Sequence, residues 1–197
     1  MTAKIKLNAA SGGGSFSLQA PSSSSNNRVM TLPDTADGTI LTTTNPKTDN
    51  IIQIVSTTKT DSTSTSTSGS FQDVSGMSVT ITPSSTSSKI FILISLNSVS
   101  SLDGIAVAFK LLRGSTAVGN TAGSGTMAGF ASLYAGGGTG DEYILSGSHN
   151  FLDSPSTTSS TTYKLQWRNT SGTTYLNQYY GGNYEAASSI TAMEVAG

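Results

Sequence analysis

Few side chains in this sequence have the type and spacing that catalysis requires. His149 is the only histidine, and cysteine is absent. A catalytic zinc ion is held by several imidazole, thiolate or carboxylate ligands, and a single histidine does not supply such a set. Many serines are available for a Ser-His-Asp triad, but the sequence contains no Gly-x-Ser-x-Gly elbow. We therefore expect His149 to be a structural residue at a strand end or in a loop.

The remaining candidates for reactive sites are acids and glycines. Glycoside hydrolysis needs two carboxyl groups that flank one bond, whereas the neighbours Asp141 and Glu142 would point to opposite faces of a strand. Asp34–Gly38 lacks the ligand spacing of a calcium loop, and no Lys-Ser or Lys-Thr pair follows the glycines of 136–140. The sequence predicts no enzyme activity, no metal ion and no cofactor.

Tyrosines and amides gather close to the C-terminus. Tyrosine rings supply rigid stacking faces together with a hydroxyl group, and neighbouring amides add hydrogen bonds, a mixture that suits sugar recognition. The candidate ligand contacts are Tyr175, Asn177, Tyr179, Tyr180 and Tyr184. The alternative is that these rings fill the core or a subunit interface.

Charge is sparse along the whole chain. Charged residues make up 11% and the net charge is −1, against a usual charged share of about 25%, while Ser and Thr fill about a third of the sequence. No basic patch indicates nucleic-acid binding, and no apolar run reaches the roughly 18 residues of a membrane span. The first residues lack the apolar stretch of a signal peptide. A virion component released by lysis would fit these features, with a cytosolic protein as the alternative.

Short apolar stretches between polar loops predict the fold of residues 51–197. A helix over Ser101–Leu112 is an alternative, but Gly104 and the β-branched residues favour a strand there. The expected strands are Ile51–Thr57, Phe71–Val74, Met77–Thr82, Lys89–Asn97, Ile105–Arg113, Gly129–Ala135, Tyr143–Phe151, Thr161–Arg168, Thr174–Tyr180 and Ser189–Val195. Such spacing is typical of an all-β protein, an antiparallel β-sandwich of the jelly-roll kind.

Apolar positions within these strands predict the core. Tyr163–Arg168 and Ile190–Val195 should each direct apolar residues to one side, and Asn169–Gly172 should join two strands as a hairpin. Ile90–Leu96 is uniformly apolar, so we expect burial on both faces, at the centre of the sandwich or at a subunit interface. The candidates for core or trimer interface are Ile90, Ile92, Ile94, Leu96, Trp167, Ile190, Met193 and Val195.

Residues 1–45 form a separate β-rich region, followed by a linker at 46–50. Lys4–Leu7 and Ser15–Leu18 alternate polar and apolar residues, and Val29–Leu41 reads as two short strands around turns. Units this small cannot bury their own apolar face, so we expect neighbours, most simply copies of the same segment. The candidate assembly residues are Val29, Met30, Leu32, Pro33, Asp37, Gly38, Ile40 and Leu41.

Two stretches resemble known virion proteins. The phrase Leu32-Pro33-Asp34 followed by Asp37-Gly38 is similar to N-terminal segments of phage fibres and other virion structural proteins. The ending from Tyr163 to Val195 resembles the closing strands of trimeric jelly-roll heads of the tumour-necrosis-factor/C1q kind. The resemblance implies a short homotrimeric phage fibre on the particle surface. Residues 1–45 would contact other virion proteins, and the head would bind a glycan or protein of the host surface. A capsid decoration or head-fibre protein is the alternative, ahead of a glycan-cleaving enzyme.

Overall fold

The structure is a computed structural model, and it describes residues 4–8, 11–19, 22–23, 25, 29, 46–102, 104–134, 136, 142–180, 182 and 185–197. The backbone divides into two compact units, Met1–Ile40 and Leu41–Gly197. The domain limits predicted from the sequence, with a linker at 46–50, stay a prediction. Within the described residues, no helix is long and apolar enough to cross a membrane.

The first unit contains an antiparallel hairpin of β1 (Lys4–Asn8) and β2 (Ser15–Gln19). Both strands were predicted from their alternation. The turn between them includes Gly12 and Gly13, whose positive φ angles of 83° and 71° favour glycine. Ile5 is the register partner of Leu18, and both side chains are exposed. The hairpin therefore carries apolar residues that it does not bury itself.

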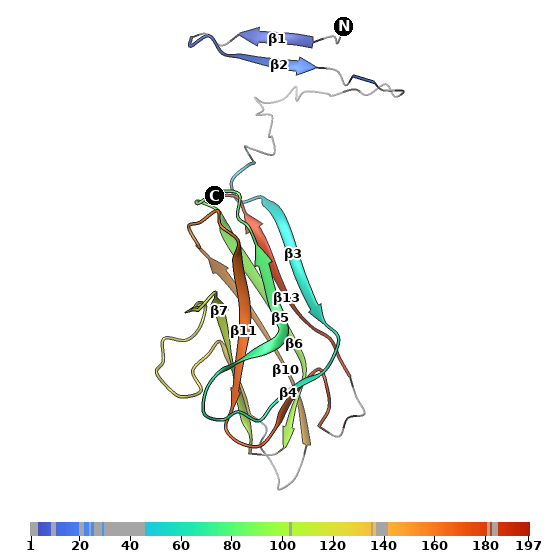
Figure 1. Cartoon of the computed structure of the whole chain (residues 1–197), viewed down its shortest axis with the longest axis vertical. Coiled ribbons are helices and arrows are strands. Elements are labelled where there is room, and N and C mark those ends of the chain that lie inside the picture. Colours follow the sequence, from blue (N-terminus) through green and yellow to red (C-terminus); the bar gives the residue numbers. More distant parts are fainter. Residues whose placement is uncertain are drawn as a thin grey trace, which may run out of the picture. The chain divides into compact units, whose positions relative to one another are not determined.

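The second unit is an antiparallel β-sandwich with jelly-roll strand order, which confirms the predicted fold class (Figure 1). One sheet, here the terminal sheet, has the neighbours β3 (Ile51–Lys59), β13 (Ser188–Val195), β6 (Lys89–Leu102) and β10 (Glu142–Asp153), with β12 (Thr174–Leu176) and β4 (Thr63–Thr65) beside the second half of β6. The other, the opposite sheet, has β5 (Gln72–Ile81), β11 (Thr161–Asn169) and β7 (Ala106–Arg113), with β8 (Thr116–Ala117) and β9 (Ala131–Tyr134) pairing with the two ends of β7.

Alternating apolar residues of both sheets fill the space between them. Tyr163, Leu165 and Trp167 of β11 are buried, while the residues between them are half-exposed, as the alternation predicted. From the terminal sheet, β6 and β13 contribute buried residues in the same manner. The largest fully buried apolar side chains are Tyr163, Phe109, Met77, Ile81, Ile90, Ile92, Leu96, Leu111, Leu165, Leu176 and Ile190.

Three strand predictions were wrong in detail. The turn at Asn169–Gly172 does not close a hairpin, because β11 belongs to the opposite sheet whereas β12 pairs with β4 and β6 of the terminal sheet. The stretches predicted as separate strands around Gly76 form the single strand β5, with Gly76 at φ 77°. The short strands β4 and β8 were missed, since threonine-rich segments of two or three residues carry no period.

Two burial predictions also need correction. Ile90–Leu96 is buried on one face only: its even-numbered residues are in the core, whereas Phe91 is half-buried and Leu93 is exposed. In β13 the core face includes Ile190 and Glu194, so Met193 and Val195 lie on the outer face. The alternation in β13 was therefore assigned to one side too simply, because a charged residue occupies an inward position.

Candidate contact surface

The segment after β12 is anchored by Asn177. Its backbone has φ 64°, in the left-handed region that asparagine tolerates. Nδ2 donates hydrogen bonds to the carbonyl oxygens of Lys59 (2.8 Å) and Asp61 (3.1 Å), and Oδ1 accepts one from Ser188 Oγ (2.6 Å). Asn177 is 1% exposed. It therefore positions the tyrosines, and it does not present its amide to a ligand as the sequence suggested.

Tyr175 and Tyr180 form an aromatic pair beside this anchor. Their ring centroids are 5.4 Å apart and the planes meet at 87°, an edge-to-face contact. Both residues are half-exposed. Ser100, the register partner of Tyr175, is buried and donates from Oγ to the carbonyl oxygen of Gln178 at 2.6 Å. The segment thus holds two rings in fixed orientation with part of their surface open for stacking.

The other predicted contact residues are placed unequally. Tyr179 is half-exposed next to this pair, and Tyr184 lies outside the described residues. Within the described part of the chain, the candidate surface consists of Tyr175, Tyr179 and Tyr180. Its chemistry is that of aromatic faces and phenol hydroxyls, which suits a neutral ligand such as a sugar.

His149 is a packed residue within β10, where a strand end or loop had been expected. Its ring stacks on Phe130, with centroids 4.6 Å apart and planes at 11°. Burial lowers the pKa of His149, and a hydrogen bond with the backbone of Gly119 opposes this effect. Nε2 is buried and has no hydrogen-bond partner among the described residues. The same part of the chain contains no group of three metal-ligating side chains.

A buried polar cluster that the sequence did not reveal joins the two sheets. Arg113 Nη1 of β7 donates to both oxygens of Asp153 of β10, at 2.9 and 2.7 Å, and Tyr163 Oη of β11 donates to Asp153 Oδ2 at 2.6 Å. Burial first, and then the hydrogen bond to Asp153, raises the pKa of the Tyr163 hydroxyl. Each oxygen of the carboxylate is paired, so the cluster is a structural connection.

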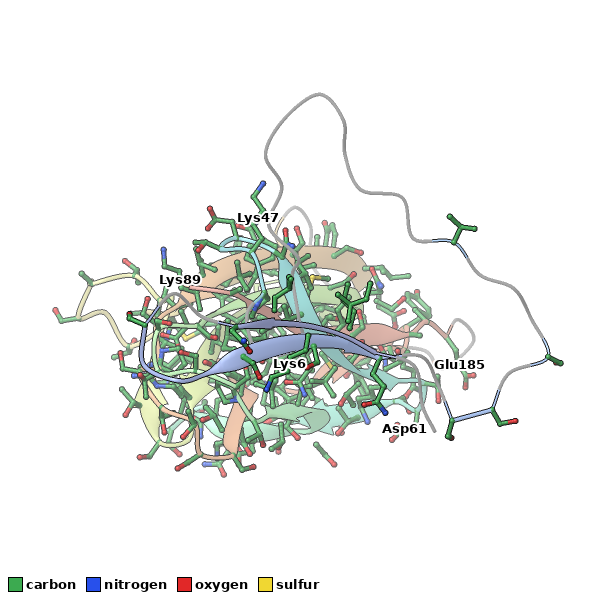
Figure 2. All side chains as sticks on the ribbon, turned by 90° about the horizontal axis from the view of Figure 1, so that it is seen from above. Lys6, Lys47, Asp61, Lys89 and Glu185 are labelled. Atoms are coloured by element: carbon green, nitrogen blue, oxygen red, sulfur yellow. The ribbon has the colours of Figure 1, made fainter. Side chains whose placement is uncertain are left out.

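Two other buried charges hold loops in place. Glu194 is 1% exposed and accepts hydrogen bonds from the backbone N (2.6 Å) and Oγ (2.7 Å) of Ser84. The buried Lys59 donates to Asp61 at 2.7 Å, and this hydrogen bond lowers the pKa of Asp61. Asp61 itself is exposed at the periphery of the sandwich (Figure 2). Each of these ionic groups therefore fixes a loop to a strand of the sandwich.

The predicted assembly and core residues fall into four groups. Ile90, Ile92, Ile94, Leu96, Trp167 and Ile190 lie in the core, whereas Met193 and Val195 lie on the outer face of the terminal sheet. Val29 is exposed. The other assembly candidates, Met30, Leu32, Pro33, Asp37, Gly38, Ile40 and Leu41, lie outside the described residues, as does Asp141.

Known structures offer limited similarity. The chain is similar to the VP2 subviral particle of infectious bursal disease virus, with a TM-score of 0.43 and 14% identity over 94% of this chain and 43% of that one. It is also similar to T=1 particles derived from that virus (TM-score 0.40, 14% identity, 92% of this chain and 45% of that one). For the Gt strain of the virus the TM-score is 0.35, with 14% identity over 94% of this chain and 48% of that one.

The chain spans less than half the length of these viral proteins. No protein-family model and no curated protein matches the sequence. With TM-scores below 0.5, these similarities assign no function to the chain.

Proposed function

We propose that this protein is a structural component of a virion, a short homotrimeric phage fibre without enzyme activity. Residues 1–45 attach it to other virion proteins, and the sandwich binds a glycan or protein of the host surface. The observation that carries the proposal is that the two ends of the sandwich differ. The chain enters it beside its own C-terminus, and the tyrosine surface lies at the other end.

Hydrogen bonds and strand register place these two features at opposite ends of the sandwich. The backbone N of Asp49 donates to Ala196 O at 2.8 Å, and the N of Ala196 donates to Asn50 O at 2.9 Å. Strand β6 begins at this end, where Lys89 is the register partner of Val195, and Tyr175 pairs with Ser100 near the other end of β6. Figure 1 shows the C-terminus beside the start of β3, with β4 at the far end. A protein attached through its first residues would present the tyrosine end outward.

The N-terminal hairpin supports an attachment role. Two-stranded hairpins are marginally stable alone in water, and Ile5, Leu7 and Leu18 are 64%, 58% and 38% exposed. Such a unit gains stability when its apolar residues meet another surface. The Leu32-Pro33-Asp34 phrase, with its resemblance to virion proteins, follows in the same region.

Particle location tests the virion role. Antibodies against the full chain should label purified particles, at the tail for the fibre and at the capsid for the alternative of a decoration or head-fibre protein. Absence of the protein from purified particles would overturn the proposal.

Host binding tests the role of the tyrosine surface. Fluorescently labelled full-length protein should bind host cells, and the double substitution Tyr175→Ala and Tyr180→Ala should reduce binding at least tenfold, which corresponds to about 1.4 kcal/mol. Tyr134→Ala is the matched control, because Tyr134 is an exposed tyrosine of β9 in the opposite sheet. Equal binding by the double variant and the control would remove the tyrosines from the contact.

A further inference from the structure

The outer face of the terminal sheet has rows of side chains that run across β3, β13, β6 and β10. In one row, Met193 pairs with Ile54 on one side and with Phe91 on the other, and Phe91 pairs with Leu152. Register partners in antiparallel strands project to the same face. Four apolar side chains from strands far apart in sequence therefore lie next to one another.

The rows become more polar from one end of the strands to the other. The next row contains Ser56, Thr191, Leu93 and Asn150, and the hydrogen bond between Ser56 Oγ and Thr191 Oγ1 (2.8 Å) confirms their common face. The row beyond consists entirely of hydroxyl side chains: Thr58, Ser189, Ser95 and Ser148. The fully apolar row thus lies nearest the end where the chain enters the sandwich, the mixed row follows with Leu93 as its apolar member, and the hydroxyl row lies toward the tyrosine end.

Five side chains form the apolar patch: Ile54, Phe91, Leu93, Leu152 and Met193. Ile54 is 59% exposed, Leu152 47% and Leu93 36%, and Phe91 and Met193 are half-buried. None of the five has a charge or a side-chain hydrogen-bonding group. Lys89 lies exposed in the adjoining row, beside Val195, and projects from the periphery in Figure 2.

We propose that the apolar patch is the surface through which copies of this chain contact one another. The inference rests on the proposed function, because it specifies where the homotrimer forms. The patch stabilises the assembly by removing its apolar area from water. The neighbouring Ser/Thr row forms the polar rim of this contact, where its hydroxyls keep hydrogen bonds to water.

The chemistry of the face favours a second copy as the occupant. A polar or charged partner would lose hydrogen bonds to water and find no replacement on five apolar side chains. Copies of the same chain bring equally apolar patches, so around a three-fold axis each patch is buried against those of its two neighbours.

The size of the face agrees with such a contact. Four strands about 4.8 Å apart, with about 3.4 Å per residue over the eight residues of β13, cover roughly 500 Å² of flat area. Protruding side chains add accessible surface to this flat area, which brings the face toward the about 800 Å² per partner that stable interfaces bury.

The position of the patch also fits an assembly of identical chains. Ile51, at the start of β3, pairs with Val195 in the row beside Ile54 and Met193, and Asn50 is bonded to Ala196. Copies joined at the patch would therefore bring their entering segments close together. Short N-terminal segments with exposed apolar residues could then associate with each other as well.

Cysteine substitution tests the proposal directly, because the natural chain has no cysteine. The full-length variant Leu152→Cys should react with a maleimide reagent at least tenfold more slowly than Ser78→Cys. Ser78 is the matched control, since it is exposed on the outer face of β5 in the opposite sheet. Ile54→Cys, on another strand of the patch, should be protected like Leu152→Cys. Equal reactivity of patch and control cysteines overturns the inference.

Light scattering identifies what covers the patch. We expect the wild type and Ser78→Lys at about 60 kDa, three times the 20.1 kDa of the chain. Leu152→Lys should yield a folded monomer, with its β-sheet circular dichroism retained. A protected cysteine in a chain of monomer mass would mean that the N-terminal segment covers the patch, and it would overturn the inference. An unchanged mass for Leu152→Lys would do the same.

These outcomes are separate from those of the proposed function. A trimer whose patch cysteines react freely overturns the interface and leaves the fibre proposal intact. A protein that is missing from particles overturns the fibre proposal, whereas protected cysteines in a 60 kDa species, about three chains, would still support the interface.

Discussion

The outer faces of the two sheets cover the same core and differ in chemistry. On the opposite sheet, Asp73 accepts hydrogen bonds from Lys164 Nζ and Gln166 Nε2, each at 2.7 Å. On the terminal sheet, the corresponding surface holds Phe91 and Leu152 in one row. The outer face of the opposite sheet is therefore polar. The outer face of the terminal sheet exposes apolar side chains that the described residues of the chain do not cover.

Further contacts give the opposite sheet its polar surface. Lys110 Nζ lies 4.0 Å from the centroid of the Phe71 ring, and Thr80 and Thr162 share a hydrogen bond of 2.8 Å between their hydroxyls. Long side chains here cover apolar atoms with their stems and keep their charges in solvent. Core packing alone therefore does not determine the outer residues of a sandwich, because each outer face also depends on whether it contacts water or another surface.

Two neighbouring residues of β10 should separate folding from assembly. Asp153 faces the core, whereas Leu152 faces outward. Asp153→Ala leaves Arg113 without its carboxylate and should lower the free energy of unfolding by about 3 kcal/mol, or about 6–12 °C in Tm. Denaturant unfolding of dilute protein measures the change.

Leu152→Ser is the control for that experiment. In the dissociated monomer it should change the free energy of unfolding by less than about 0.5 kcal/mol, because it removes an exposed side chain. Similar losses of unfolding free energy in Asp153→Ala and Leu152→Ser would contradict the assignment of Asp153 to folding and of Leu152 to assembly.

A smaller effect should appear in the dependence of Tm on protein concentration. If the apolar patch joins copies, unfolding is coupled to dissociation, and a tenfold increase in concentration should raise Tm by about 2–4 °C. Calorimetry of the wild type, Leu152→Lys and Ser78→Lys over a range of concentrations measures this. We expect the dependence to vanish only in Leu152→Lys. A reversible, concentration-independent Tm for the wild type would show that the apolar patch does not join copies of the chain.

The sequence predicts the two-layer architecture well because the strands alternate locally. Within the single strand β11, the alternation of Tyr163, Leu165 and Trp167 with polar residues predicts a core face. The apolar patch, by contrast, depends on the register of β3, β13, β6 and β10, and no local pattern reveals which residues become neighbours.

The same limit applies to the candidate contact surface. Asn177 has the composition of a ligand contact, yet its amide is used by the carbonyl of Lys59, 118 positions earlier. Asp153, Arg113 and Tyr163 come from three strands, so their cluster has no sequence signature. The tyrosines were found because aromatic residues beside amides are visible in the sequence without knowledge of the fold.

A pH dependence should arise from His149 on the inner side of β10. Burial lowers its folded pKa below the ordinary value of 6.5. Between these two values the unfolded chain binds a proton that the folded chain does not, so stability should fall as pH drops below about 6.5. Tm of the wild type should be lower at pH 5.5 than at pH 7.5, and His149→Gln should reduce this difference. A difference that persists fully in the variant would assign it to other groups.

The smallest effect concerns the polar face. The hydrogen bond from Lys164 first, and that from Gln166 second, lower the pKa of Asp73 below its ordinary value of 3.8. The ionised carboxylate therefore contributes stability above about pH 3.8, and this contribution is lost as pH falls through the folded pKa. Because the Asp73 side chain is 54% exposed, solvent screens the pair, and Asp73→Asn should cost no more than about 0.5 kcal/mol at pH 7.

Salt distinguishes this weak surface pairing from a structural role. The difference between wild type and Asp73→Asn, measured by urea unfolding, should shrink toward zero in 1 M NaCl, where the screening length is about 3 Å. A loss above 1 kcal/mol that persists in salt would mean that the polar face also holds the fold together. A small loss that salt removes would mean that the polar face contributes little to folding and contacts water only. Association of copies would then depend on the apolar patch of the terminal sheet.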